Sequence, residues 1–180
     1  MKVIAFTGSL RKASYNHALL VTAKEMAPAG MEIEIFDVGQ FPLYNQDLEV
    51  NFPQVVADFK AKVVAADAVL IATPEFNFSV PGVLKNALDW GSRPYGQNCF
   101  NDKPVAIMGA AYSMGGSGKA QYHLRQIFVE LNMHAMNKPE LMIPVPHEKF
   151  DADGKLTDER VRENLKLFLD AFVVWTARLK

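Results

Sequence analysis

The sequence AVLIATPEFNFSVPG, residues 68–82, is the stretch that decides the fold class. Its first five residues form a continuous apolar run, which is typical of a strand buried on both faces of a parallel sheet. Pro81 suits the first position of a helix, and Leu84 and Leu88 follow at helical spacing. The stretch therefore predicts a buried strand, then a loop with prolines at both ends, then a helix.

The alternation of strand and helix continues outward from this stretch to both ends of the chain. Further strands are predicted at residues 1–7, 31–38, 104–110 and within 134–143. The other helices are predicted at residues 16–27, around the apolar positions of 55–63, around those of 124–131 in a helix that also holds residues 118–126, and from 157. Five strands that alternate with five helices, without hairpin turns, predict an α/β fold: a three-layer, doubly wound domain with a five-stranded parallel sheet. We expect residues 1–180 to form a single such domain.

The composition narrows the classes of function. The 19 basic and 20 acidic residues give a formal net charge of -1, which argues against nucleic acid as a main partner. The single cysteine, Cys99, excludes an internal disulfide and a thiolate zinc site, so redox chemistry would need a bound group. No apolar run approaches the ~18 residues of a membrane span, and the N-terminal apolar run is too short for a signal peptide. We therefore expect a cytoplasmic protein without a membrane partner.

In a doubly wound sheet, ligands bind at the carboxyl ends of the strands, which makes three loops candidates for a binding site. We call residues 8–16, 73–81 and 110–118 the first, second and third loops. The first loop offers hydroxyls, a guanidinium, an ammonium and a carboxamide beside outward-pointing N–H groups, as a phosphate cradle does. It has one glycine and is therefore not a dinucleotide fingerprint. The alternative is a capped turn, with Ser14 or Asn16 as the N-cap and Arg11 in solvent.

The second and third loops suit a flat ligand. In the second loop, Phe76 and Phe78 would pack beside a ring, and the alternative is that each lies in the core or in a subunit interface. The third loop has the small residues of a triphosphate-binding loop, but Ser113 replaces its first glycine and Ala120 cannot supply the magnesium hydroxyl. Small residues let a ring approach the backbone, and the alternative is a flexible turn.

Residues for other kinds of chemistry are isolated or absent. The four histidines are far apart in the sequence and pair with no carboxylate at ligand spacing, so no metal site is predicted. There is no GxSxG motif, and a lone Cys99 in a loop is more often incidental than a nucleophile. No side chain stands out as a catalytic acid or base. This pattern fits a protein whose reactive atom belongs to a cofactor.

Three longer motifs, which follow one another along the chain, carry a family resemblance. They are GSLRKASYN at residues 8–16, TPEFNFSVPGVLKNALDW at residues 73–90 and GKAQYHLRQ at residues 118–126. Together they resemble the NADPH-dependent FMN reductase family, which has a flavodoxin-like fold, and most closely its bacterial chromate and quinone reductase branch. The similarity runs over nearly the whole chain.

The resemblance implies an FMN site made by the three loops, with no metal ligand and no catalytic side chain. The first loop would bind the FMN phosphate, the second would hold the isoalloxazine through backbone groups, and the third would lie along the opposite part of the ring. The residues implied are Ser9, Arg11, Ser14, Tyr15, Asn16, Pro74, Glu75, Phe76, Asn77, Phe78, Ala111, Tyr112, Ser113 and Gly115. The sequence departs from the family pattern at Ala13, where Gly is usual, at Phe76 and Phe78, where Tyr is frequent, and at Lys119, where Arg is common.

The same resemblance implies a reaction and an assembly. Hydride would pass from NADPH or NADH to N5 of FMN, and from there to a quinone, an azo compound, a metal oxyanion such as chromate, or free flavin. A homodimer or a dimer of dimers is implied, with Phe78, Trp90 and Tyr95 near the subunit contacts. Two alternatives stay open: a flavodoxin-like electron carrier without NAD(P)H oxidase activity, and a non-catalytic binding domain. The physiological oxidant and the choice between NADPH and NADH also stay open.

Overall fold

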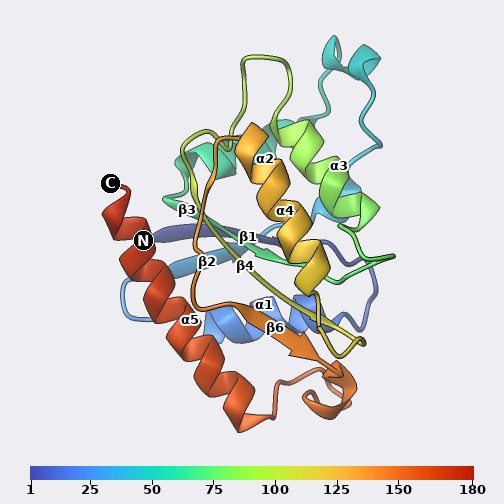
Figure 1. Cartoon of the computed structure of the whole chain (residues 1–180). Helices are drawn as coiled ribbons and strands as arrows, with labels where there is room; N and C mark the ends of the chain where they lie inside the picture. The colour runs from blue at the N-terminus through green and yellow to red at the C-terminus, as the bar shows by residue number, and fades with distance from the viewer.

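A parallel β-sheet lies between two layers of helices in the computed structural model, which describes residues 1–180 (Figure 1). The strands are β1 (Lys2–Thr7), β2 (Glu32–Ile35), β3 (Ala68–Ala72), β4 (Pro104–Ala111), β5 (His134–Ala135) and β6 (Leu141–Pro144). The helices are α1 (Tyr15–Glu25), α2 (Gln54–Ala65), α3 (Gly82–Gly91), α4 (Gly118–Glu130) and α5 (Glu159–Arg178), with short 3-10 helices at Val38–Gln40, Gln46–Glu49 and Pro146–Glu148. No helix is both long enough and apolar enough to cross a membrane. The predicted three-layer α/β architecture is confirmed.

The order of the strands places the switch point of the sheet between β1 and β3. The order is β2-β1-β3-β4-β5, β6 also pairs with β4, and all pairs are parallel. From β1 the chain goes to the edge strand β2 and then returns past β1 to β3. Ligands of doubly wound sheets bind at the carboxyl ends of the strands beside such a reversal. The first, second and third loops follow the three strands nearest to it.

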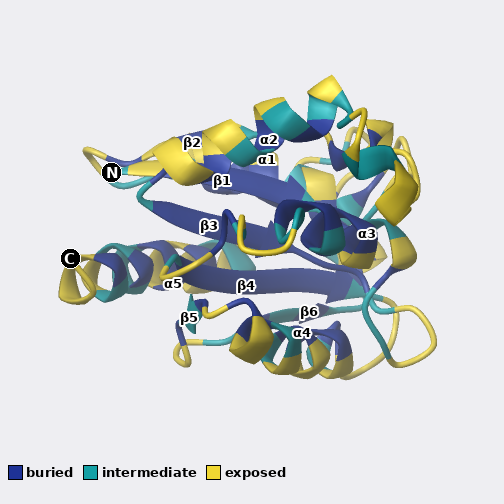
Figure 2. Cartoon of the chain, turned by 90° about the horizontal axis from the view of Figure 1, so that it is seen from above, coloured by how far each residue is buried: buried dark blue, intermediate teal, exposed yellow.

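Two hydrophobic cores hold the layers together. Because successive side chains of a strand point to opposite faces, Val3 and Ala5 of β1 join the core under α1 and α5, whereas Ile4 and Phe6 join the core under α2, α3 and α4. Every residue of β3 is buried, as its continuous apolar run predicts. Figure 2 shows the buried strands in dark blue, between helices whose outer faces are exposed.

Several boundaries differ from the prediction, and three of them have a local reason. The second strand ends at Ile35 rather than Val38, because the Asp37 carboxylate accepts a hydrogen bond from the N–H two residues on and starts a 3-10 helix. The fifth strand is divided into β5 and β6, and Pro139, which has no N–H to donate, lies between them. Helix α5 begins two residues later than predicted, because Asp158 caps it.

Two glycines permit the close approaches that bring the loops together. A Cβ atom on Gly8 would lie 2.9 Å from Cγ of Pro81, so any larger residue would push α3 away from the end of β1. A Cβ atom on Gly109 of β4 would lie 2.1 Å from the carbonyl oxygen of Thr73. Glycine at both positions therefore lets the second loop pass between the first and the third.

Candidate ligand-binding site

A cavity of about 740 Å³ opens at the carboxyl ends of β1, β3 and β4, and we call it the main cavity. Its walls are the three loops that the sequence indicated. The lining residues are Ser9, Arg11, Ser14, Tyr15, Asn16, Pro74, Glu75, Phe76, Asn77, Phe78, Ala110, Ala111, Tyr112, Ser113 and Pro146. All the residues predicted for the site are thus brought together, except Gly115, which lies farther along the third loop and does not line the cavity.

Two lining residues, Ala110 and Pro146, were not predicted. Pro146 follows β6, and the residue before it, Val145, has a φ of 46°. This left-handed conformation is costly for a β-branched residue, so the surrounding structure must hold it in place. The bend brings Pro146 to the cavity and stacks the ring of His147 on that of Tyr112, with centroids 5.7 Å apart. The position of this segment at a strand end was the only signal in the sequence.

The first loop presents a run of free hydrogen-bond donors. None of the backbone N–H groups of residues 10–16 donates to an acceptor within the protein. Ser14 is the N-cap of α1, and its hydroxyl accepts a hydrogen bond from the N–H of His17 at 3.2 Å. The helix macrodipole adds partial positive charge at this point. The loop is therefore a capped turn that also matches a phosphate.

Arg11 brings a full positive charge to the same end of the cavity. Its Nη1 donates to the Tyr112 hydroxyl at 3.3 Å, and its Cζ lies 5.4 Å from the centroid of the Tyr15 ring. The hydrogen bond raises the pKa of Arg11 and lowers the pKa of Tyr112, because it stabilises the guanidinium cation and the phenolate. The guanidinium is exposed, as the capped-turn alternative expects, and it also spans from the first loop to the third.

The Asn16 side chain has a structural role. It is buried, and its Nδ2 donates to the carbonyl of Ala110 while its Oδ1 accepts from the N–H of Ala110, both at 2.9 Å. This pair joins the start of α1 to the end of β4. One donor and one acceptor of the carboxamide are thus used within the protein, and the backbone N–H of Asn16 is available to a ligand.

The second loop is a tight turn with an unusual backbone. Phe76 and Ser79 exchange backbone hydrogen bonds of 3.1 and 2.9 Å, and the two residues between them have φ values of 49° for Asn77 and 62° for Phe78. Such a turn is usually made by Asn-Gly, because the left-handed conformation is costly for a residue with a large side chain. The N–H groups of Glu75, Asn77 and Phe78 donate to no acceptor in the protein. The backbone is thus fixed in a form that leaves donors free.

Glu75 holds the second loop on α4. Its Oε2 accepts hydrogen bonds from the N–H of Lys119 at 2.8 Å and of Ala120 at 3.3 Å, in the first turn of the helix. A carboxylate at this place satisfies donors that the helix itself leaves unpaired. The Glu75 side chain is therefore a helix cap, and its backbone is the part that faces the cavity.

The third loop is a defined turn rather than a flexible one. The Ser113 hydroxyl donates to the carbonyl of Gly116 at 2.8 Å, and the N–H of Gly116 donates back to the carbonyl of Ser113 at 2.9 Å. Gly116 has a φ of 57°, which favours glycine. The N–H groups of residues 112–115 donate to no acceptor in the protein. The cavity is thus edged by free N–H donors on three sides.

The comparisons with known proteins agree with this geometry. The model of a family described as NADPH-dependent FMN reductase matches residues 1–148. The chain belongs to this family. It is 48% identical over 181 residues to an NAD(P)H-dependent FMN reductase of Pseudomonas aeruginosa, with 100% of this chain and 97% of the relative covered. It is 41% identical over 175 residues to a 2-hydroxy-1,4-benzoquinone reductase of Burkholderia, with 97% and 96% covered.

Solved structures of flavoenzymes share the fold of this member of the FMN reductase family. FerB, a flavoenzyme NAD(P)H:(acceptor) oxidoreductase from Paracoccus denitrificans, superposes with a TM-score of 0.91 at 39% identity, over 98% of this chain and 97% of FerB. A flavodoxin, WrbA-like protein from Agrobacterium tumefaciens superposes with a TM-score of 0.64 at 13% identity, over 99% and 98%. The predicted flavodoxin-like fold is confirmed.

Three of the four departures from the FMN reductase pattern lie together at the exposed edge of the second loop, namely Phe76, Phe78 and Lys119. The rings of Phe76 and Phe78 are 55% and 66% exposed, so neither belongs to the core. The ammonium of Lys119 lies 3.0 Å from the centroid of the Phe78 ring, which is a cation–π contact. This edge, at the mouth of the main cavity, is thus apolar, with one positive charge beside it. The placement of these rings in a subunit interface stays a prediction.

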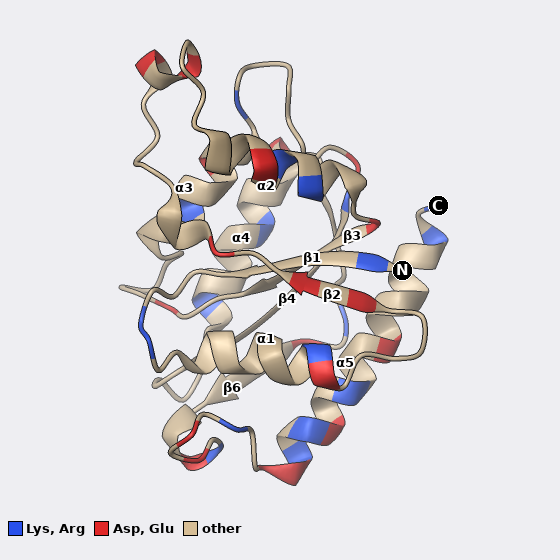
Figure 3. Cartoon of the chain, turned by 180° about the vertical axis from the view of Figure 1, so that it is seen from behind, with Lys and Arg blue, Asp and Glu red and all other residues tan.

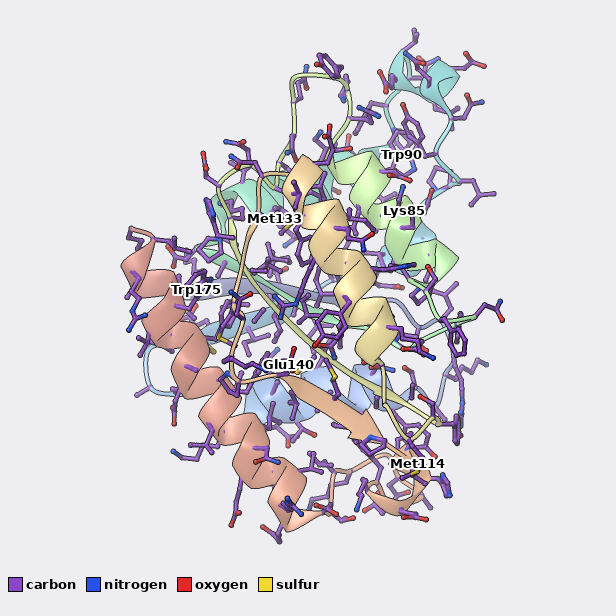
Figure 4. All side chains as sticks on the ribbon, viewed as in Figure 1. Lys85, Trp90, Met114, Met133, Glu140 and Trp175 are labelled. Carbon is purple, nitrogen blue, oxygen red and sulfur yellow. The ribbon has the colours of Figure 1, made fainter.

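Trp90 and Cys99 of this reductase-family chain are both buried, and burial decides what each can do. Trp90 was expected near a subunit contact, but it is completely buried in α3, where its Nε1 donates to the carbonyl of Pro42 at 2.8 Å (Figure 4). That expectation is wrong, because a buried ring cannot reach another subunit. Cys99 is also buried, and its burial raises the pKa of the thiol to about 12, so the thiol stays protonated near neutral pH. No cluster of three or more His, Cys, Asp or Glu side chains can hold a metal ion.

Proposed function

We propose that this protein is an FMN-dependent NAD(P)H oxidoreductase that reduces quinones. The observation that carries the proposal is the main cavity at the switch point, edged by the free N–H groups of three loops, in a chain of the NADPH-dependent FMN reductase family. The cavity volume of about 740 Å³ lies within the usual range for a site of this kind.

The chemistry of the donors fits FMN. The free N–H groups of residues 10–16, the Ser14 hydroxyl and the Arg11 guanidinium suit a phosphate dianion. The N–H groups of the second and third loops suit the carbonyl oxygens and nitrogens at the edges of a flat heterocycle. We therefore assign the FMN phosphate to the first loop and the ring to the space between the other two loops.

Bound FMN supplies the hydride acceptor and donor, and the protein supplies orientation, exclusion of water and electrostatic stabilisation. The second loop does this with backbone N–H groups of Glu75, Asn77 and Phe78, which suit negative charge at the pyrimidine edge of a ring. The turn and the Glu75 cap hold these groups in place within the protein. No side chain at the site is assigned the role of a catalytic acid or base.

The acceptor is assigned from the mouth of the cavity. The exposed rings of Phe76 and Phe78 suit a flat apolar oxidant, and relatives are named quinone reductases. The Lys119 ammonium beside them suits an anionic oxidant such as a metal oxyanion. We extend the proposal to chromate, azo compounds and free flavin as weaker substrates that enter by the same mouth.

The proposal includes the assembly, the location and the extent of the domain. We assign residues 1–180 to a single FMN-binding domain that forms a homodimer or a dimer of dimers. Phe78 and Tyr95, which are 66% and 91% exposed, remain candidates for the subunit contacts. We also propose a cytoplasmic location, since NAD(P)H is the reductant of that compartment.

The visible spectrum of the purified protein is the first test. The protein is expected to be yellow, or to become yellow after incubation with FMN and gel filtration. Anaerobic addition of NADPH or NADH should bleach the flavin bands, and a quinone should restore them. A protein that binds FMN but is bleached by neither donor supports an electron carrier instead, and a protein that retains no FMN supports a non-catalytic binding domain.

A further inference from the structure

A second cavity, of about 630 Å³, lies on the other side of the first loop. It is formed by the carboxyl ends of β1 and β2, the first loop, the first turn of α1 and the 3-10 helix after β2. The lining residues are Thr7, Ser9, Leu10, Arg11, Lys12, His17, Ile35, Phe36, Asp37, Val38, Gly39 and Gln40. Because Ser9 and Arg11 also line the main cavity, the two cavities share one wall.

The polar side of the second cavity is basic, and two of its side chains are unpaired. Lys12 and His17 are exposed, and their side chains have neither a hydrogen-bond partner nor an ion-pair partner in the protein. The single acidic residue of the lining, Asp37, accepts hydrogen bonds from the N–H of Gly39 at 2.9 Å and from Nε2 of Gln40 at 3.2 Å. Figure 3 shows the basic stretch on the loop between β1 and α1 in blue, without an acidic residue on that loop. With Arg11 and Lys12 against Asp37, the formal charge of the lining is positive even with the histidine counted as neutral.

The other side of the cavity is apolar. Ile35, Phe36 and Val38 come from the end of β2, and Leu10 reaches them from the first loop. A Cβ atom on Gly39 would lie 2.5 Å from Cδ2 of Leu10, so the two segments touch and close the cavity at this point. An apolar wall next to unpaired basic side chains matches a purine that carries a phosphate on its ribose.

We propose that the second cavity binds the adenosine 2′-phosphate part of NADPH, and that Lys12 and His17 make the protein prefer NADPH to NADH. The inference rests on the proposed function, because it needs a dinucleotide whose nicotinamide reaches the main cavity. The shared wall at Ser9 and Arg11 provides the continuous surface for such a ligand. The FMN phosphate does not need these two side chains, since neither Lys12 nor His17 lines the main cavity.

The phosphate rather than a ribose hydroxyl is favoured by the donors of the cavity. A 2′-phosphate offers a dianion with several acceptor oxygens to the free donors of Lys12 and His17. Asp37, the acidic residue of the lining, is held in its own turn by two hydrogen bonds, whereas no hydrogen bond within the protein holds the side chain of Lys12 or His17.

The first test uses the 2′-phosphorylated fragment alone, and calorimetry measures its binding to the FMN-loaded protein. We expect 2′,5′-ADP to bind at least about tenfold more tightly than 5′-AMP, and inorganic phosphate to compete only weakly. Lys12→Ala and His17→Ala should each weaken 2′,5′-ADP about tenfold. Lys24→Ala, which removes an exposed lysine at the far end of the same helix, is the matched control and should have no effect.

The second test is the KM for each donor. We expect the ratio of the KM for NADPH to the KM for NADH to rise about tenfold in Lys12→Ala and in His17→Ala, and to stay constant in Lys24→Ala. Asp37→Asn should leave the KM for NADH unchanged.

Several results overturn the inference. They are equal binding of 5′-AMP and 2′,5′-ADP, an unchanged KM ratio in both variants, or a raised KM for NADH in Asp37→Asn, which would make the cavity an NADH ribose site. Loss of FMN from Lys12→Ala would instead assign the cation to the cofactor phosphate. If neither donor reduces wild-type protein, the proposed function fails, whereas the fragment-binding arm still tests the cavity.

Discussion

The first and second loops present the same kind of group to the main cavity but are held in opposite ways. The first loop has φ values in the ordinary regions and is anchored by polar side chains, through the Ser14 cap and the pairing of Asn16 with Ala110. The second loop has a strained backbone at Asn77 and Phe78 and is anchored through one carboxylate on a neighbouring helix. The difference teaches that a polar side chain at a binding site can hold the loop backbone in place, so that the backbone N–H groups, rather than the side chain itself, contact the ligand.

The largest effect is expected in the first loop, from Asn16→Ala. Removing the carboxamide leaves the N–H and the carbonyl of Ala110 buried without these partners, which should lower the free energy of unfolding by about 3 kcal/mol. Urea unfolding of the protein without FMN measures this. Asn51→Ala is the control, because the Asn51 side chain is exposed and makes no hydrogen bond, so it should stay within about 0.5 kcal/mol of wild type. Equal stability of the two variants would contradict the anchoring role.

Arg11→Ala should separate ligand binding from anchoring in the same loop. Arg11 is exposed and donates to a single hydroxyl, so its removal should leave the stability without FMN unchanged. The dissociation constant for FMN should rise about tenfold, which corresponds to ~1.4 kcal/mol, because a charge-assisted contact to the phosphate is lost. Fluorescence titration with FMN measures it, and Arg11→Lys should recover part of the affinity. An unchanged dissociation constant would remove the phosphate from this loop.

In the second loop, Glu75→Ala should lower the free energy of unfolding by about 1 kcal/mol, because the N–H groups of Lys119 and Ala120 lose their acceptor. Glu75→Gln keeps an acceptor oxygen and should lose less. Hydrogen exchange at these two amides should accelerate in Glu75→Ala and not at the far end of α4. Uniform acceleration along the helix would argue against a local cap.

The smallest effect is expected from the strained turn. Phe78→Gly and Phe78→Ala remove the same ring, but only glycine is at ease with a φ of 62°. Phe78→Gly should therefore be more stable than Phe78→Ala by about 1 kcal/mol in thermal unfolding. If the alanine variant is as stable as the glycine variant, the turn does not hold residue 78 in the left-handed region.

The location of the site can be predicted from the sequence more fully than the role of each residue in it. The apolar run of β3 and the alternation around it are enough to predict the fold and the edge at which the loops meet. The pairing of Asn16 with Ala110 could not be predicted, because it joins residues 94 positions apart whose contact depends on the finished sheet. The burial of Trp90 follows likewise from packing, since an aromatic residue on a helix is compatible with either face.

The backbone conformation of individual residues and the presence of the second cavity also could not be predicted from a single sequence. The identity of residue 145 as valine does not indicate a left-handed conformation, since that conformation is imposed by the packing of the segments around it. Lys12 was visible as a basic residue next to Arg11, but the cavity that it lines needs the end of β2, which lies beyond α1 along the chain.

The pairing of Asn16 with Ala110 has a consequence for how fast a ligand binds. Because a buried amide fixes the start of α1 to the end of β4, the protein itself sets the spacing between the first and third loops. Such a site loses little conformational entropy when it is filled. The rate of association is then governed by diffusion and charge, and the lifetime of the complex by the contacts that must break.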